Sequence, residues 1–456
     1  MTTPPDPLAV LRSRSYIVLL VLATVIGMPI AAAAYFFLAA VHWLQGWIFT
    51  DIPHGLGFGS EPLWWPILPL TLAGLLVALT IKYLPGTGGR SPADGFKAGE
   101  GAPTPIELPG VILAALATLS LGVVLGPEAP LIAIGGGLGV CAIRLVKRDA
   151  PARVSAMVAA AGSFAAISAL LGSPLLGAFL LMEASGLGGA MLELVLVPGL
   201  LAAGIGFLIF VGLGHATGLG TFSLAIPNLP HVGSPTLAEF GWAIVIGLLA
   251  TLFGTAIRRL GLLIRPHVEP RMVLVTPVVG LAIAGLAIAF AAGTGKGTSE
   301  VLFDGQDALG PFLTHASSYT VGALLLLLAC KGLAYGASLS SFRGGPVFPS
   351  MFLGAAVGVA LSHLPGLPLV PAAAMGIGAM CTVMLRLPLT SVLLATLLLS
   401  SDGLAVMPEV IVAVAVAYVA SAWLAPAPAP APSSEPPPAA ASPAQVPGHP
   451  LTGQNG

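Results

Sequence analysis

The sequence predicts an all-α protein that crosses a membrane many times and is built from two related halves. Hydrophobic residues make up 56% of the 456 residues and charged residues only 8%, with a mean hydropathy of +0.99, whereas soluble domains carry about 25% charged residues. Two Gly-Pro segments, "GPEAP" (126–130) and "GPVFP" (345–349), interrupt apolar sequence in corresponding places. We therefore expect an inverted repeat with many tilted, partly re-entrant helices.

Several apolar stretches are long enough to cross a bilayer, which takes roughly 20 helical residues. They run over 16–42, 63–84, 108–125, 190–213, 240–263, 273–292, 319–338 and 405–424. The first is longer than the apolar part of a signal peptide, so it should remain as a membrane helix. Other apolar stretches are shorter or are broken by Gly and Pro.

Composition and repetition divide the chain into four parts. We expect a short N-terminal segment (1–15), a first membrane repeat (16–215), a second membrane repeat (216–424) and a tail (425–456). The tail begins "APAPAPAPSSEPPP", a composition that buries too little apolar surface to offset its ordering entropy. The tail is therefore predicted to be disordered.

Charge is sparse and unevenly placed. The net charge of −1 gives no field that would attract nucleic acid. Basic residues gather near the N-terminus, in 144–153 and in 258–271, which predicts that these segments are cytoplasmic. A compact chain without regulatory domains is consistent with a bacterial cytoplasmic membrane. Lys331 lies within an apolar stretch, where it would either reach an interface or add positive potential to a vestibule.

Two alignments within the chain support the duplication. Residues 126–139 align with 345–358, and residues 161–181 align with 375–395 at nearly the same offset. The matched pairs are Gly126 with Gly345, Pro127 with Pro346, Pro130 with Pro349, Gly135 with Gly354, Gly139 with Gly358, Gly162 with Gly376 and Pro174 with Pro388. Inverted repeats in membrane proteins commonly place a substrate site at their interface, between interrupted helices.

Glu128 is the acid inside the first Gly-Pro segment. Helix N-termini carry unpaired N–H groups and partial positive charge, so they attract anions. Glu128 could be a tethered carboxylate where a mobile anion also binds, or a helix cap past which no ion moves. An ionisable residue in a transmembrane region is a functional candidate.

These motifs resemble those of the CLC family of chloride channels and chloride/proton antiporters, whose patterns are G-[KR]-E-G-P, G-x-F-x-P and G-S-G-I-P. Here they read "GPEAP", "GPVFP" and, loosely, "GTGGRSP" (86–92), and the resemblance extends over about 15–424. It implies a divergent prokaryotic-type member without CBS domains. It also implies transport of chloride or a similar anion across a lipid bilayer by a homodimer, with Glu128 as the gate.

The chain departs from the family pattern at the anion site. Pro127 and Pro346 have no N–H to offer an anion, and Gly89 stands where the family has a coordinating serine. The resemblance therefore assigns anion binding to the amides of Glu128, Ala129, Val347 and Phe348, and to a hydroxyl of Thr87 or Ser91.

Proton coupling is the second departure. Antiporters of the family carry an internal proton-transfer glutamate, the second acid of a pair, and this chain has Glu183 followed by Ala184. Either Glu183 replaces the missing acceptor, or the chain conducts anions without strict coupling to protons. We favour a channel-like or weakly coupled transporter.

Other function classes fit the sequence less well. A fluoride/proton antiporter would have different residues around the gating acid, and a non-transporting membrane scaffold would need no gate. An enzyme would need a nucleophile with a base or a metal cluster, and neither G-x-S-x-G nor H-E-x-x-H occurs. We therefore expect no catalysis, no cofactor and no metal.

Overall fold

The computed structural model describes residues 12–97, 101–186, 190–218, 226, 230–399 and 402–425. The N-terminal segment and the tail predicted to be disordered lie almost entirely outside these residues. The first half contains α2 (Arg14–Gly46), α3 (Ile52–Gly55), α4 (Ile67–Tyr83), α5 (Leu108–Ser120), α6 (Glu128–Val146), α7 (Ala152–Leu171), α8 (Pro174–Ser185) and α9 (Ala190–Thr217).

The second half continues with helices throughout. They are α10 (Leu237–Val268), α11 (Met272–Thr294), α12 (Gln306–Thr314), α13 (Val321–Ser341), α14 (Val347–Leu361), α15 (Leu369–Leu385), α16 (Pro388–Leu397) and α17 (Gly403–Trp423). Short single turns link them: η1 (Trp47–Asp51), η2 (Pro85–Gly88), η3 (Pro92–Asp94), η4 (Glu269–Arg271), η5 (Thr298–Glu300) and η6 (Ala316–Ser318). The all-α prediction is confirmed.

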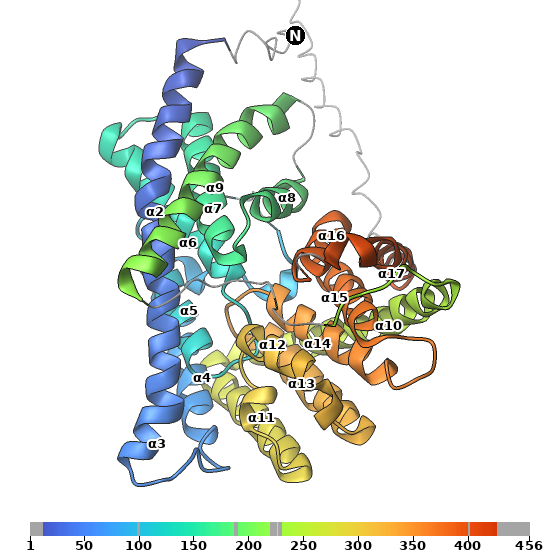
Figure 1. Cartoon of the computed structure of the whole chain (residues 1–456). Helices are drawn as coiled ribbons and strands as arrows, with labels where there is room; N and C mark the ends of the chain where they lie inside the picture. The colour runs from blue at the N-terminus through green and yellow to red at the C-terminus, as the bar shows by residue number, and fades with distance from the viewer. Residues whose placement is uncertain are drawn as a thin grey trace, which may run out of the picture.

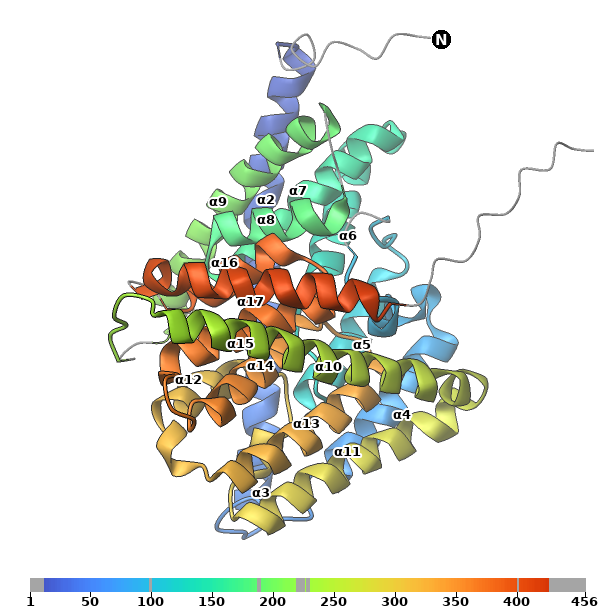
Figure 2. The same cartoon turned by 90° about the vertical axis from the view of Figure 1, so that its right-hand side faces the viewer.

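The helices form one body with the interrupted helices at its centre. In Figure 1, α2 runs along one side, α16 and α17 lie on the opposite side, and α14 and α15 lie between them. Figure 2 shows α10 and α17 side by side across another face, in agreement with their extensive packing. α10 starts at a capping box in which Thr236 and Glu239 each accept the other's backbone N–H.

The aligned glycines of the two halves make the same contacts. α6 packs on α7, and α14 packs on α15, more closely than any other helix pairs. A Cβ atom on Gly135 would lie 2.5 Å from the carbonyl oxygen of Gly162, and a Cβ atom on Gly354 would collide with that of Gly376. Small residues at both crossings let the backbones approach closely, which is the duplicated packing that the alignment predicts.

The expected membrane helices are partly corrected. Among the described residues, the apolar segments long enough to span are Tyr16–Gly55, Glu128–Val146, Val154–Leu171, Val195–Thr217, Leu237–Thr294, Val321–Ser341 and Gly403–Trp423. The stretches 63–84 and 108–125 form the shorter helices α4 and α5, with 17 and 13 residues. In contrast, α6 and α7 are both long enough to span a membrane. Their glycines pack against each other and do not end the helices.

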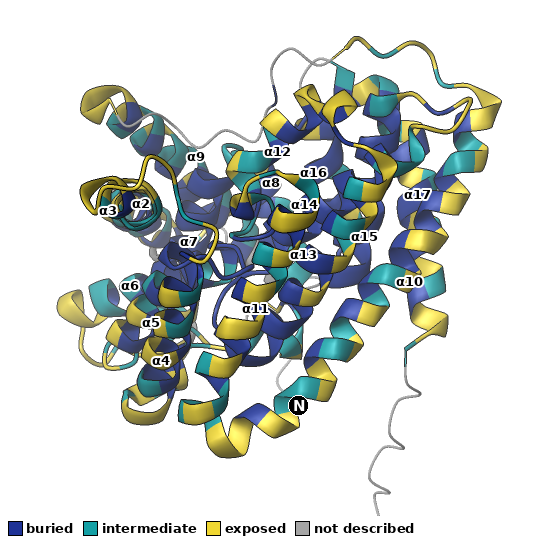
Figure 3. Ribbon diagram, turned by 90° about the horizontal axis from the view of Figure 1, so that it is seen from below, coloured by how far each residue is buried: buried dark blue, intermediate teal, exposed yellow. Residues whose placement is uncertain are grey.

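Burial distinguishes the central helices from the outer helices. The side chains of α14 and α15 are almost all buried, whereas α10 and α17 expose leucine, isoleucine and valine along one side (Figure 3). A helix satisfies its own backbone hydrogen bonds, so its outer face can be apolar and lie against lipid. The buried pair α14–α15 is thus held away from lipid, where irregular backbone beside it is tolerated.

Candidate functional site

The two Gly-Pro segments meet at the interface between the halves. Gly126 and Gly345 form an isolated antiparallel bridge, with N–O distances of 2.8 Å from Gly126 N and 2.6 Å from Gly345 N. α6 begins at Glu128 and α14 begins at Val347, two residues beyond each glycine. The bridge therefore fixes two helix N-termini next to each other.

Glu128 from one half caps the helix of the other half. One carboxylate oxygen, Oε1, accepts the backbone N–H of Phe348 at 2.8 Å. The side chain is fully buried, and Oε2 has no hydrogen-bond partner in the part of the chain that the structure describes. The carboxylate occupies the position at the N-terminus of α14 that suits an anion.

The bridging glycines make room for this carboxylate. A Cβ atom on Gly345 would overlap Oε2 of Glu128, and one on Gly126 would overlap Oε1. Any other residue at either position would push the carboxylate away from α14. The two glycines of the motif are therefore required by close approach.

The prolines set where the helices start. Pro127 and Pro346 are the N-cap residues of α6 and α14, and Pro130 and Pro349 lie in the first turns, where an N–H would have no intrahelical partner. The carbonyl oxygen of Pro346 accepts the hydroxyls of Tyr335 at 3.0 Å and Ser350 at 2.5 Å. The contact with Tyr335 could not be inferred from the sequence because Tyr335 lies in another helix.

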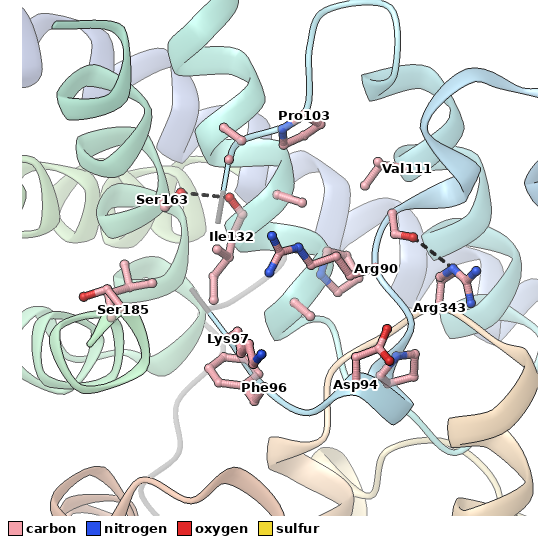
Figure 4. A pocket seen from close by; sticks show the side chains of 18 of the residues that line it. Arg90, Asp94, Phe96, Lys97, Pro103, Val111, Ile132, Ser163, Ser185 and Arg343 are labelled. Atoms are coloured by element: carbon pink, nitrogen blue, oxygen red, sulfur yellow. Dashed lines mark hydrogen bonds between the residues drawn. The ribbon is translucent and has the colours of Figure 1, made fainter. Parts of the chain in front are cut away.

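A cavity of about 650 Å³ opens toward these helix N-termini (Figure 4). Ala129, Pro130 and Pro346 form part of its wall, together with Thr87 and Ser91. The two residues predicted to supply a hydroxyl therefore do lie at the cavity. Val347 and Phe348 are buried beside Glu128 and do not line it.

The "GTGGRSP" segment also forms a tight turn that binds Arg343. Gly86, Thr87, Gly88 and Gly89 all have positive φ, between +51° and +92°, a conformation that only glycine adopts without cost. This turn directs the carbonyl oxygens of Thr87 and Gly89 to Nε of Arg343, at 3.2 and 3.1 Å. Arg343 was not among the predicted site residues.

Glu183, the candidate proton acceptor, is also a helix cap. Its carboxylate accepts the backbone N–H groups of Leu389 at 3.0 Å and Thr390 at 2.8 Å, and the Thr390 hydroxyl at 2.6 Å. These are the first residues of α16 after Pro388. Both acids therefore reach across to the N-terminus of a helix in the second half.

Lys331 follows neither of the two expectations. Its side chain is fully buried, and Nζ donates to the carbonyl oxygens of Glu300, Val301, Leu302 and Phe303 at 3.0 to 3.3 Å. It also lies 4.5 Å from the centre of the Phe352 ring. Lys331 thus stabilises the loop between α11 and α12 instead of reaching an interface or facing the cavity.

Metal binding gains no support from the geometry. Within the described ranges, no group of three or more His, Cys, Asp or Glu side chains is placed to hold an ion. The three cysteines are unpaired thiols, with Cys330 and Cys381 buried. The groups that remain at the site are carboxylates, backbone amides and basic side chains.

Comparison with known proteins agrees with this arrangement. The family model described as "Voltage gated chloride channel" matches residues 73–422. The protein named "Putative ion-transport protein YfeO" in Escherichia coli O1:K1 / APEC is 29% identical over 382 residues, which cover 82% of this chain and 84% of that one. The protein of the same name in Shigella boydii serotype 4 matches equally well.

Two solved structures share the fold. One is the crystal structure of a slow cyanobacterial Cl⁻/H⁺ antiporter, with a TM-score of 0.71 and 20% identity, covering 89% of this chain and 94% of that one. The other is a CLC-type fluoride/proton antiporter, with a TM-score of 0.61 and 21% identity, covering 89% and 95%. With the fold shared and the family model matched over most of its length, this multi-pass membrane chain belongs to the voltage gated chloride channel (CLC) family.

Proposed function

We propose that this chain transports chloride or a similar monovalent anion along a path that Glu128 opens and closes. The observation that carries the proposal is the Glu128 carboxylate bound to the N–H of Phe348, at a helix N-terminus that would otherwise attract an anion. When the carboxylate is protonated or displaced, its place becomes available to a mobile anion. The cavity beside Ala129 and Pro346 supplies the approach from one side.

Weak proton coupling is the second part of the proposal. A proton relay through Glu183 would have to release three hydrogen bonds from Leu389 and Thr390, and each hydrogen bond to a charged group is worth about 1.5–3 kcal/mol. Such a side chain is better suited to hold α16 than to carry protons. This contact favours a channel-like or weakly coupled transporter over a strict antiporter.

The antiporter reading stays as the alternative because both structural neighbours are described as proton antiporters, one for chloride and one for fluoride. We further expect a homodimer with one path in each subunit, in a bacterial cytoplasmic membrane. The apolar outer faces of α10 and α17 suit burial in lipid or against a second copy.

The test is flux from proteoliposomes, with chloride and proton movement recorded together under an imposed chloride gradient. Wild-type chloride flux should rise as the pH falls, because a protonated Glu128 competes poorly with an anion, and Glu128→Gln should carry flux independent of pH. Asp149→Asn, which removes an exposed acid, should behave as wild type.

Three outcomes would change the conclusion. Glu128→Gln with unaltered pH dependence would remove Glu128 as the gate. Proton movement uphill in fixed ratio to chloride would establish the antiporter alternative. A folded protein without any anion flux would leave the scaffold hypothesis.

A further inference from the structure

Arg343 is a buried cation in the wall of the cavity. It lies in the loop between α13 and α14, is only 9% exposed, and lines the cavity together with Gly344 and Pro346. Its backbone N–H donates to the hydroxyl of Thr118 at 3.4 Å, which holds this loop against α5. Figure 4 shows Arg343 on the side of the cavity opposite Ile132 and Ser163.

Only part of the guanidinium is used by the protein. Nε donates to the carbonyl oxygens of Thr87 and Gly89, and Nη1 donates to that of Phe342 at 3.2 Å. A guanidinium has five N–H donors, so the Nη2 group and the second N–H of Nη1 find no acceptor within the residues that the structure describes. The bonds to Nε hold the guanidinium in one orientation beside the cavity.

The charge of Arg343 also lacks an acidic partner. Burial lowers the pKa of Arg343 to about 10, with the neighbouring Arg265 acting in the same direction, so the guanidinium is charged at neutral pH. Asp94 and Glu269, the nearby acids, are both ion-paired with Arg265. No described carboxylate lies within 4 Å of Arg343, although buried charges are normally paired.

The cavity wall carries both cations and acids. Its charged lining residues are Arg90, Lys97, Arg265 and Arg343 against Asp94 and Glu107. Ion pairs offset the charge of Arg265, so the buried Arg343 is the cation through which this wall would attract an anion. Chloride has no preferred bonding plane, whereas a guanidinium matches a planar oxyanion with two parallel N–H···O bonds.

We propose that Arg343 binds the transported anion in this cavity through its Nη donors, and that its planar fork favours a small planar oxyanion such as nitrate over chloride. The inference rests on the proposed function and adds a residue and a selectivity to it. Arg343 comes from the second half of the chain and contacts the loop that contains Gly89. Its guanidinium therefore supplies a hydrogen-bond donor where Gly89 stands in place of the family's serine hydroxyl.

The experiment compares nitrate and chloride on the purified full chain. Binding of each anion is measured by calorimetry and by the anion-dependent shift in thermal unfolding at constant ionic strength. Flux of each anion is measured in proteoliposomes. Wild-type protein should bind nitrate more tightly than chloride. Arg343→Gln should weaken both by about ten-fold or more, as expected for loss of a charged hydrogen bond.

Arg343→Lys separates charge from geometry. It keeps the cation but not the fork, so chloride binding should survive while the preference for nitrate disappears. Arg271→Lys, at an exposed position, is the matched control and should keep the wild-type ratio. If neither Arg343 variant folds, wild-type protein still decides the question, because a nitrate affinity no greater than that for chloride overturns the proposal.

Failure of this inference differs from failure of the proposed function. Wild-type flux of both anions, with unchanged affinities and an unchanged nitrate-to-chloride ratio in folded Arg343 variants, would remove Arg343 as a ligand and leave Glu128 as the gate. Absence of flux in the wild type would instead contradict the transport function itself.

Discussion

Gly345 lies against the carboxylate of Glu128 so closely that even a methyl group on Gly345 would overlap Oε2. The gate that we propose would combine a glycine of one half with an acid of the other. The carboxylate can bind Phe348 because neither Gly126 nor Gly345 carries a side chain.

Replacing Gly345 with alanine should open the gate. The added Cβ displaces the carboxylate, so Gly345→Ala should show higher flux at neutral pH and a flatter pH profile in proteoliposomes. Gly285→Ala, in α11 with no atom within 4 Å of the added Cβ, should match the wild type. A Gly345→Ala protein that keeps the full pH dependence would contradict the close-packing argument.

Replacing Glu183 should affect stability more than transport. Glu183→Gln loses the charge on its bonds to Leu389 and Thr390, so the free energy of unfolding should fall by about 1–3 kcal/mol, measured by thermal unfolding in detergent. Ser173→Ala removes the N-cap of α8 and should cost about 1 kcal/mol. Loss of proton movement in Glu183→Gln at unchanged stability would instead identify a relay.

Replacing Lys331 should destabilise the loop between α11 and α12. Lys331→Met leaves four carbonyl oxygens, two of them buried, without their donor, and the cost should be about 3 kcal/mol or more. Chemical denaturation would measure it. Lys82→Met, at an exposed position, should change stability little, and equal losses in the two variants would refute the structural role of Lys331.

Asp304, in the same loop, should make stability depend on pH. Burial raises the pKa of Asp304 from 3.8 to about 7; Asp307 adds to this, while the Gln306 amide and the Lys331 ammonium oppose it. The unfolded chain ionises first, so this group's contribution to stability falls as the pH rises from about 4 to 7 and is constant above that.

The variant Asp304→Asn should lack this fall, so its stability relative to wild type should improve between pH 4 and 7. Unfolding midpoints measured across that range would test it. Asp51→Asn removes an exposed acid and should follow the wild-type curve. Parallel curves for Asp304→Asn and wild type would contradict the assignment.

The sequence predicted the features that depend on local geometry. Glycine and proline constrain their own backbone, so the aligned motifs and the helix starts could be inferred from spacing. Spacing also indicated glycines that permit close helix contact, but the pairing of α6 with α7 and of α14 with α15 came from the structure. The position of Glu128 at a helix start followed from the same signals. Its bond to Phe348 required the fold, because the two residues are far apart in the chain.

The contacts of the charged side chains could not be predicted from the sequence. Arg343 meets Thr87 and Gly89, and Glu183 meets Thr390, across the boundary between the halves. No periodicity or motif encodes such contacts. The lengths of α4 and α5 were also overestimated, because hydropathy extends into the segment before α4 and into the loop after α5.

In the proposed mechanism, the carboxylate of Glu128 acts as a competitive inhibitor attached to its own transporter. A ligand tethered by a short segment acts at an effective concentration on the order of millimolar, so a mobile anion must outnumber it to gain the N-terminus of α14. The transported ion is then also the activator. The anion concentration that gives half-maximal flux should therefore be raised by the tethered competitor, and it should fall once that competitor loses its charge.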